Sequence, residues 1–219
     1  MVIVLFDVDG TLVDSTEPIL TALNDALAEN ALPPVSADKL WKFVGPPIHQ
    51  ALQSVMKGWG ENTDLVPKLV SDFRKVYRPL SLELAATYPG VPEMLVDMSR
   101  IARLGVVTSK PADYARPILE RLDFAEYFEV IEGPDVGTEV EPKVVTLRRG
   151  LAAMHVESSD GQIFMVGDRR QDVEAGRACD VQTIGVTWGF GSREELESAA
   201  ADTVINEPNQ LLGLISYRP

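Results

Sequence analysis

Acidic side chains are paired at two places in the chain, and both pairs have a spacing that could bind a divalent cation. Asp7 and Asp9 stand two residues apart after an apolar run, so an extended backbone would direct both carboxylates to the same side. Gly10 follows and permits a tight turn with exposed backbone N–H groups. Asp168 and Asp172 form a second pair. Mg²⁺ prefers such oxygen ligands, and we therefore expect it as the cofactor.

Hydroxyl groups and lysines follow at two further places. Thr108 and Ser109 stand directly before Lys110, and Lys143 lies at the start of a predicted helix. Taken singly, each feature has an ordinary structural explanation, because loop acids are solvated, Ser, Thr and Asp cap helices, and lysines face water. Taken together, they supply the nucleophile, hydroxyl donor, cation and metal-binding acids that phosphoryl transfer through an aspartyl-phosphate requires.

Each of these groups is expected at the end of a strand or the start of a helix. Apolar runs typical of strands buried on both faces cover residues 2–6, 104–108, 128–131, 163–166 and 183–186. Helical patterns alternate with them over residues 93–103, 112–122, 144–154 and 172–179. This alternation predicts an α/β fold with a doubly wound parallel sheet. Ligands bind such sheets at the carboxyl ends of the strands, where the acids, hydroxyls and lysines are expected.

The alternation stops over residues 15–85. Three apolar stripes with helical spacing begin there at Ile19, Ile48 and Leu65, and proline or glycine pairs separate them. We therefore expect an all-helical cap at residues 15–85, inserted after the first strand. Residues 1–14 and 86–219 are expected to form the α/β core.

The composition limits the classes of partner. The net charge of −13 would repel a phosphate backbone, so we expect no nucleic-acid partner. No apolar stretch could span a membrane, and the N-terminal run lacks the basic region of a signal peptide, so we expect a cytoplasmic protein with no membrane partner. A single cysteine, Cys179, excludes an intrachain disulfide, and His49 and His155 are too far apart in sequence to indicate a zinc cluster.

The four segments resemble, in order, the four motifs of haloacid dehalogenase superfamily phosphatases, and the resemblance covers essentially the whole chain. Residues 6–15 are similar to the first motif and residues 166–172 to the fourth, and both are highly specific. Residues 107–109 resemble the second motif and Lys143 the third, by position alone. Pro142 precedes Lys143, whereas many relatives have the proline after the lysine. Lys110 is therefore a competing cation, and we favour Lys143.

The resemblance implies a covalent mechanism. Asp7 would attack phosphorus and form an aspartyl-phosphate, while Asp9 would protonate the leaving oxygen and then deprotonate the hydrolytic water. Lys143 would offset the charge of Asp7 and the phosphoryl group. The phosphoryl oxygens would be bound by the hydroxyl and backbone N–H groups of Thr108, Ser109 and the turn near Gly10.

The same resemblance implies the metal ligands. The side chains of Asp7 and Asp168 and the backbone carbonyl of Asp9 would bind Mg²⁺. Asp172 would lie behind these ligands or reach the metal through water.

The same residues favour or disfavour the other reactions that occur on this fold. Dehalogenases and phosphonate-cleaving enzymes lack the second aspartate as families, so Asp9 argues against both. A sugar-phosphate mutase uses both aspartates and stays open as a less favoured alternative. A non-enzymatic scaffold would be expected to have lost a motif residue, and all four motifs are intact here.

The cap is expected to choose the leaving group of a small-molecule phosphate ester. Residues 43–47, which include Phe43 and Gly45, form a rigid apolar loop that resembles the substrate-side loop of phosphoglycolate phosphatase-like members. A simple connector between two helices would have the same sequence pattern. We expect phosphoglycolate-like substrates first, although the cap lysines form no obvious basic cluster. Nucleoside monophosphates come second, because the fourth motif resembles that of 5′-nucleotidase-like relatives and Phe43 or Trp41 could stack on a base. Residues 14–16 and 84–88 are expected hinges, and the chain is expected to be a monomer or homodimer.

Overall fold

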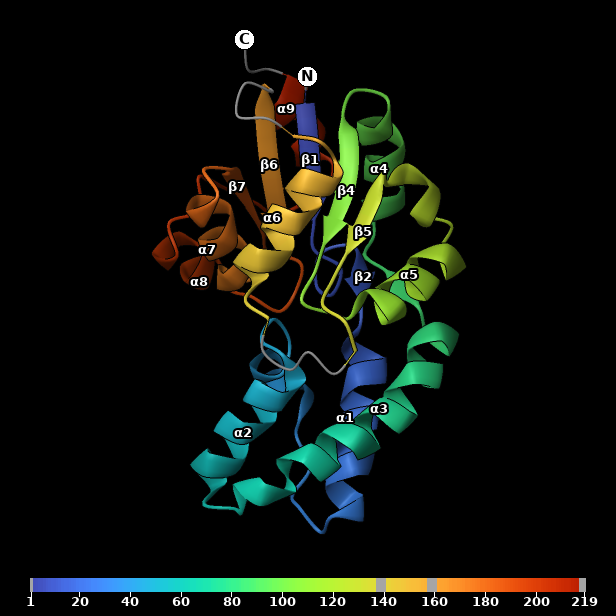
Figure 1. Ribbon diagram of the computed structural model, residues 1–219, viewed down its shortest axis with the longest axis vertical. Helices are drawn as coiled ribbons and strands as arrows, with labels where there is room; N and C mark the ends of the chain where they lie inside the picture. Colours follow the sequence, from blue (N-terminus) through green and yellow to red (C-terminus); the bar gives the residue numbers. More distant parts are fainter. Residues whose placement is uncertain (1, 137–140, 157–160, 217–219) are drawn as a thin grey trace.

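The computed structural model describes residues 2–136, 141–156 and 161–216, which form a sheet unit and a helical unit stacked end to end (Figure 1). The six-stranded sheet has the order β5-β4-β1-β6-β7-β8, and every neighbouring pair is parallel. Its strands are β1 (Val2–Phe6), β4 (Arg103–Val107), β5 (Val130–Glu132), β6 (Gln162–Gly167), β7 (Gln182–Val186) and β8 (Thr203–Ile205). The strand order reverses beside β1, which opens a crevice at the carboxyl ends of β1, β4 and β6. The predicted doubly wound α/β fold is confirmed.

Helices cover both faces of the sheet because the side chains of β1 alternate between them. Ile3 and Leu5 belong to a buried cluster beneath α6 (Lys143–Ala153) and α7 (Arg170–Ala178). Val4 and Phe6 belong to the cluster on the other face, which is covered by α4 (Val91–Ser99), α5 (Ala112–Arg121) and α9 (Gln210–Ser216). The remaining helix, α8 (Arg193–Ser198), packs beside β7 and α7.

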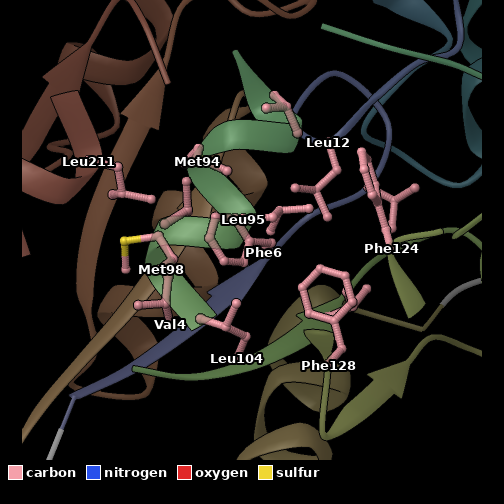
Figure 2. Close-up of a cluster of buried hydrophobic side chains, with 14 of the residues drawn as sticks. Val4, Phe6, Leu12, Met94, Leu95, Met98, Leu104, Phe124, Phe128 and Leu211 are labelled. Atoms are coloured by element: carbon pink, nitrogen blue, oxygen red, sulfur yellow. The ribbon is translucent and has the colours of Figure 1, made fainter. Parts of the chain in front are cut away.

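Figure 2 shows how α4 anchors the strand that leads into the acidic pair. Leu95 and Met98 of α4 pack in the same buried cluster as Val4 and Phe6 of β1. Leu95 is fully buried, so its truncation to Ala would cost about 2–5 kcal/mol in the free energy of unfolding. This packing fixes the carboxyl end of β1, which is the point where Asp7 leaves the sheet.

The helical unit has a hydrophobic core of its own. It contains α1 (Thr16–Glu29), α2 (Ile48–Trp59) and α3 (Val66–Glu83), with two short 3₁₀ helices, η1 (Ala37–Lys42) and η2 (Thr63–Leu65). Its buried cluster is separate from those of the sheet and includes Leu23, Leu27, Leu52, Met56 and Leu69. We keep residues 15–85 as the proposed bounds of the cap. None of the helices in the described ranges is both long and apolar enough to cross a membrane.

A two-stranded antiparallel ribbon that the sequence does not predict joins the two units. In it β2 (Val13–Asp14) pairs with β3 (Ala86–Thr87), and the Thr87 hydroxyl donates a hydrogen bond of 2.8 Å to the carbonyl of Leu12. The two expected hinge segments therefore lie side by side where the chain enters and leaves the cap.

Other differences from the sequence expectation concern short elements. The strand β8 and the helices α8 and α9 have between three and seven residues each, too few for a periodic pattern to stand out. The helix expected over residues 93–103 ends at Ser99, because β4 already begins at Arg103, which pairs with Ile3 of β1.

Candidate active site

Three carboxylates meet at the carboxyl ends of β1 and β6. Asp7 follows β1 and Asp168 follows β6, and these strands are neighbours in the sheet. Asp172 lies in the first turn of α7, where its Oδ2 accepts a hydrogen bond of 2.9 Å from the backbone N–H of Arg169. All three side chains are buried, and one oxygen from each lies within 4.8 Å of the other two. The parallel sheet thus brings together acids that lie far apart in the sequence.

The acidic cluster carries more negative charge than the surrounding protein offsets. Burial raises the pKa of Asp168 well above its usual value, and the carboxylates of Asp172 and Asp7 raise it further. Burial also raises the pKa of Asp172 to about 6, although Lys143 opposes this shift. The Oδ1 atoms of Asp7 and Asp172 face Lys143 as ion pairs, but neither accepts a well-aligned hydrogen bond from the described residues. Buried oxygen donors with uncompensated charge fit a divalent cation such as Mg²⁺.

Lys143 lies against Asp7, the expected nucleophile. It is the first residue of α6, and its Nζ is 2.8 Å from Asp7 Oδ1 and also contacts Asp172. Burial lowers the pKa of Lys143, but the two carboxylates outweigh this effect and hold the pKa above its ordinary value. The lysine therefore keeps its positive charge beside Asp7.

Lys110 lies against the other member of the first acidic pair. Its Nζ donates a hydrogen bond of 2.6 Å to Asp9 Oδ1 and another to the hydroxyl of Tyr77, which belongs to α3 of the cap. The hydroxyl of Ser15 also donates to Asp9 Oδ1. Burial raises the pKa of Tyr77 to about 12, although Lys110 opposes the shift, so its hydroxyl stays protonated. The two lysines that compete in the sequence thus contact different aspartates.

Gly10 gives Asp168 the space it occupies. The backbone of Gly10 has φ +83°, and a Cβ atom there would lie 2.2 Å from Asp168 Oδ2. Its N–H donates a hydrogen bond of 2.9 Å to the carbonyl of Val13. In this structure the N–H of Gly10 is therefore engaged within its turn rather than directed at a phosphoryl group, and the contribution of Gly10 is close packing.

The loop after β7 holds Asp168 in place. The backbone N–H of Phe190 donates a hydrogen bond of 2.7 Å to Asp168 Oδ2, and the indole of Trp188 donates one of 3.0 Å to the carbonyl of Thr11. Residues 188–191 form a bend that follows the end of β7. Their role in orienting Asp168 comes from a backbone donor, which any residue type could supply, so the sequence carries no signal for it.

A cavity of about 100 Å³ lies over Asp7 and Asp9, between the two units. The sheet unit lines it mainly with charged, hydroxyl and aromatic residues, namely Asp7, Asp9, Thr108, Ser109, Lys110, Pro111 and Tyr114. The cap lines it mainly with apolar residues, namely Ile19, Phe43, Val44, Gly45, Pro46, Pro47, Ile48, Phe73, Arg74 and Tyr77. Phe43 and Gly45 therefore line the cavity together with Thr108 and Ser109.

Three charged or aromatic residues of the cavity, Arg74, Tyr77 and Tyr114, are not predicted from the sequence. Arg74 is half-buried on α3 and has no ion pair with another described residue, while Tyr77 and Tyr114 approach the cavity from α3 and α5. From sequence alone, a charged residue on an amphipathic helix is expected to face water. Only the packing of α3 onto the core shows that Arg74 lines the cavity. Trp41, considered for stacking on a base, is 47% exposed and is not among the described residues that line this cavity.

Known proteins are similar in sequence to this chain over most of its length. Residues 4–186 match the family model of haloacid dehalogenase-like hydrolases. The phosphoglycolate phosphatase of Nitrosococcus oceani is 32% identical over 219 residues, covering 97% of this chain and 96% of that protein. The 5′-nucleotidase of Pseudomonas aeruginosa is 33% identical over 201 residues (89% and 86%). The tyrosine-protein kinase PtkA of Mycobacterium tuberculosis is 30% identical over 218 residues (97% and 72%).

The fold recurs in solved structures as well. The crystal structure of a predicted phosphatase from Clostridium acetobutylicum superposes with a TM-score of 0.89 at 30% identity, covering 99% of this chain and 98% of that one. The sheet, the cap and their connections are therefore shared. The names of the relatives differ in substrate and even in reaction, so the substrate of this chain must be argued from its own cavity.

Proposed function

The chain belongs to the family of haloacid dehalogenase-like hydrolases and is a phosphatase, and on this premise we propose that it hydrolyses small phosphomonoesters with Mg²⁺ through an aspartyl-phosphate on Asp7. The position of Asp7 carries the proposal. Asp7 lines the cavity, belongs to the buried acidic cluster and pairs with Lys143 at 2.8 Å. A carboxylate so placed can attack an anionic phosphoryl group, because nearby positive charge offsets the repulsion.

In the first step, an oxygen of Asp7 forms a bond to phosphorus while the bond from phosphorus to the leaving oxygen breaks. Asp9, which lines the same cavity, donates its proton to that oxygen. Thr108 and Ser109 also line the cavity and would bind the phosphoryl oxygens. Lys143 would offset the charge that builds up at Asp7.

In the second step, ionised Asp9 removes a proton from a water molecule whose oxygen attacks phosphorus. The bond from phosphorus to Asp7 breaks, which releases orthophosphate and restores both carboxyl groups. Lys110 and Ser15 would hold the ionised Asp9 in position, since both donate to its Oδ1.

Mg²⁺ would be held by the side chains of Asp7 and Asp168 and by the backbone carbonyl of Asp9, with Asp172 close by. When bound, the ion would supply positive charge at the phosphoryl oxygens. The buried, under-compensated carboxylates support this assignment.

For the substrate we propose a phosphomonoester with a small anionic leaving group, with phosphoglycolate-like compounds first. The cavity of about 100 Å³ is far smaller than the ~300–1,000 Å³ of sites for drug-sized ligands. Arg74 supplies the cation that the cap lysines did not offer, and it has no described ion-pair partner of its own. A carboxylate on the leaving group would form an ion pair with Arg74.

Nucleoside monophosphates are the second candidate, and the aromatic lining favours them. Phe43, Phe73, Tyr77 and Tyr114 all contribute to the cavity, and a base could stack on such rings. The small cavity argues against a nucleoside in this closed arrangement, so the cap would have to move outward to accept one.

A panel of metabolite phosphates, ranked by kcat/KM with Mg²⁺ and with a chelator, tests the proposal. Phosphoglycolate should rank above nucleotides, and chelation should abolish hydrolysis. If nucleotides outran phosphoglycolate by more than about tenfold, or about 1.4 kcal/mol of transition-state preference, the second candidate would replace the first. Isomerisation of a sugar phosphate without release of orthophosphate would indicate a mutase. No hydrolysis of any ester, a generic aryl phosphate included, would refute the proposed function.

A further inference from the structure

Arg169 is a buried charged residue that the mechanism above does not use. It stands directly after Asp168 and directly before α7, and it is only 5% exposed. A buried guanidinium is costly unless its donors are bonded, so its partners indicate what it is there to hold.

The guanidinium of Arg169 bonds the cap on one side and the sheet unit on the other. Its Nη1 donates a hydrogen bond of 2.7 Å to the carbonyl of Trp41 and another to the carbonyl of Val44. Its Nε donates one of 2.9 Å to Glu195 Oε1 in α8. The same oxygen of Glu195 accepts a hydrogen bond of 3.0 Å from the backbone N–H of Arg170. Glu195 is therefore fixed to the sheet unit and orients the guanidinium.

The two carbonyls need such a partner because they lie at and just beyond the end of η1. The last carbonyls of a helix accept no hydrogen bond within the helix and carry partial negative charge. A guanidinium can donate hydrogen bonds to them and offset that charge. Trp41 lies in the last turn of η1, and Val44 follows Phe43, which is the C-cap residue of that helix. Arg169, a residue of the sheet unit, thus donates hydrogen bonds to the carbonyls at the C-terminal end of η1 in the helical unit.

The bonded segment is also a wall of the cavity over Asp7. Val44 and Gly45 both line that cavity. Gly45 has φ +102°, and a Cβ there would lie 3.1 Å from Arg169 Cγ, so the stem of the arginine packs against the loop. On its other side, the backbone N–H of Arg169 bonds Asp172 of the acidic cluster at 2.9 Å. One residue therefore contacts both the cavity wall and the cluster.

We propose that Arg169 is a positioning residue that latches residues 41–47 of the cap to the core when the cap is closed. The latch consists of Arg169, Glu195 and the carbonyls of Trp41 and Val44. While it is formed, the cavity wall is held at a fixed distance from Asp7, and when it breaks the loop is free to leave with the cap. Its catalytic consequence rests on the proposed function, whereas the latch itself can be measured without turnover.

Hydrogen exchange of residues 41–47 tests the latch directly, with Arg170→Ala as the matched control. Arg170 is the neighbouring arginine, but it is exposed and its side chain pairs with Glu174 on the surface of α7. In the presence of Mg²⁺ and a phosphate-mimicking fluoride complex, Arg169→Ala should speed exchange in residues 41–47 about tenfold or more, as expected for lost charged hydrogen bonds. Exchange in α1 and β1 should keep the wild-type rate, and Arg170→Ala should match the wild type throughout.

The kinetics give a second readout. Arg169→Ala should lower kcat/KM for the best phosphate ester about 10- to 100-fold, mainly through KM, because a displaced wall misplaces the leaving group. Arg169→Lys keeps the charge but not the fork of donors and should restore only part of the loss.

Several results would overturn the proposal. These are unchanged loop exchange in Arg169→Ala, an equal change in Arg170→Ala, or faster exchange throughout the molecule, which would indicate a general loss of stability. Should Arg169→Ala fail to fold, Glu195→Gln must show the same local change at smaller size, and its absence there would count as refutation. If the wild type hydrolysed no ester, the proposed function would fail while the exchange comparison still decided the latch.

Discussion

The strand ends of the sheet and the helices of the cap form opposite walls of one cavity, and they do so with different kinds of residue. The sheet wall carries Asp7, Asp9 and Lys110, each held by hydrogen bonds or ion pairs of 2.6–2.8 Å within the protein. The cap wall is mostly apolar, and its one arginine, Arg74, has no such partner among the described residues. Under the proposed function, the sheet wall would carry the residues of the reaction, whereas the cap wall would contact the leaving group.

The largest expected effect breaks the sheet side of this comparison. Asp7→Asn should lower kcat by on the order of 10⁴-fold or more, because an amide is a poor nucleophile, and removal of nucleophilic machinery has this scale in other covalent enzymes. The fold should be unchanged by circular dichroism, since the amide fills the same space. Wild-type rates in the purified variant would show that Asp7 is not the nucleophile.

The next effect separates the two lysines. Lys143→Ala should reduce turnover about 10²–10³-fold, as for loss of a preorganised charge partner, because Lys143 pairs with Asp7. Lys110→Ala should reduce it less, because Lys110 contacts Asp9 and Tyr77 instead. Steady-state kinetics of both variants decide the question, and equal losses or the reverse order would move the phosphoryl-binding role to Lys110.

The same contrast explains how much the sequence could predict. Asp7, Asp168 and Lys143 follow strands or begin helices, and parallel topology alone brings such positions together. The contribution of Arg74 depends on the angle at which α3 packs on the core, and that of Arg169 on carbonyls far away in the sequence. Neither arginine belongs to a local sequence pattern that indicates its contacts, so neither set of contacts could be predicted from the sequence.

A smaller effect sharpens the cap side of the comparison. Arg74→Ala should lower kcat/KM for phosphoglycolate about 10- to 150-fold, equivalent to one charged hydrogen bond of about 1.5–3 kcal/mol. Hydrolysis of an aryl phosphate whose leaving group has no carboxylate should change little, because the arginine would have no carboxylate to bind. Lys75→Ala is the control, since Lys75 is exposed and pairs with Asp72 of the same helix. Equal losses on both esters would remove Arg74 from substrate choice.

The smallest effect concerns pH and metal. Burial raises the pKa of Asp172 from the ordinary 3.8 to about 6 and also raises that of Asp168. Between these values the metal-free folded state binds more protons than the unfolded state, so its free energy of unfolding should fall as pH rises from 3.8 through about 6. We expect a loss on the order of 1 kcal/mol, or about 2–4 °C in Tm.

Thermal unfolding with and without Mg²⁺ measures this effect. Saturating Mg²⁺ should restore stability at neutral pH, by about 2.7 kcal/mol at a hundredfold excess over Kd. Asp172→Asn should flatten part of the pH dependence of the metal-free protein. Metal-free stability that rose over this pH interval would contradict the assigned charge imbalance.

The central claim is the covalent intermediate on Asp7, and rapid acid quench of a single turnover with ³²P-labelled substrate tests it most directly. The account predicts transient label on the peptide that contains Asp7 in the wild type. It predicts lasting label in Asp9→Asn, which lacks the base for the second step, and none in Asp7→Asn. Complete turnover of the wild type with no label on protein in either the wild type or Asp9→Asn, or label on another residue, would contradict it.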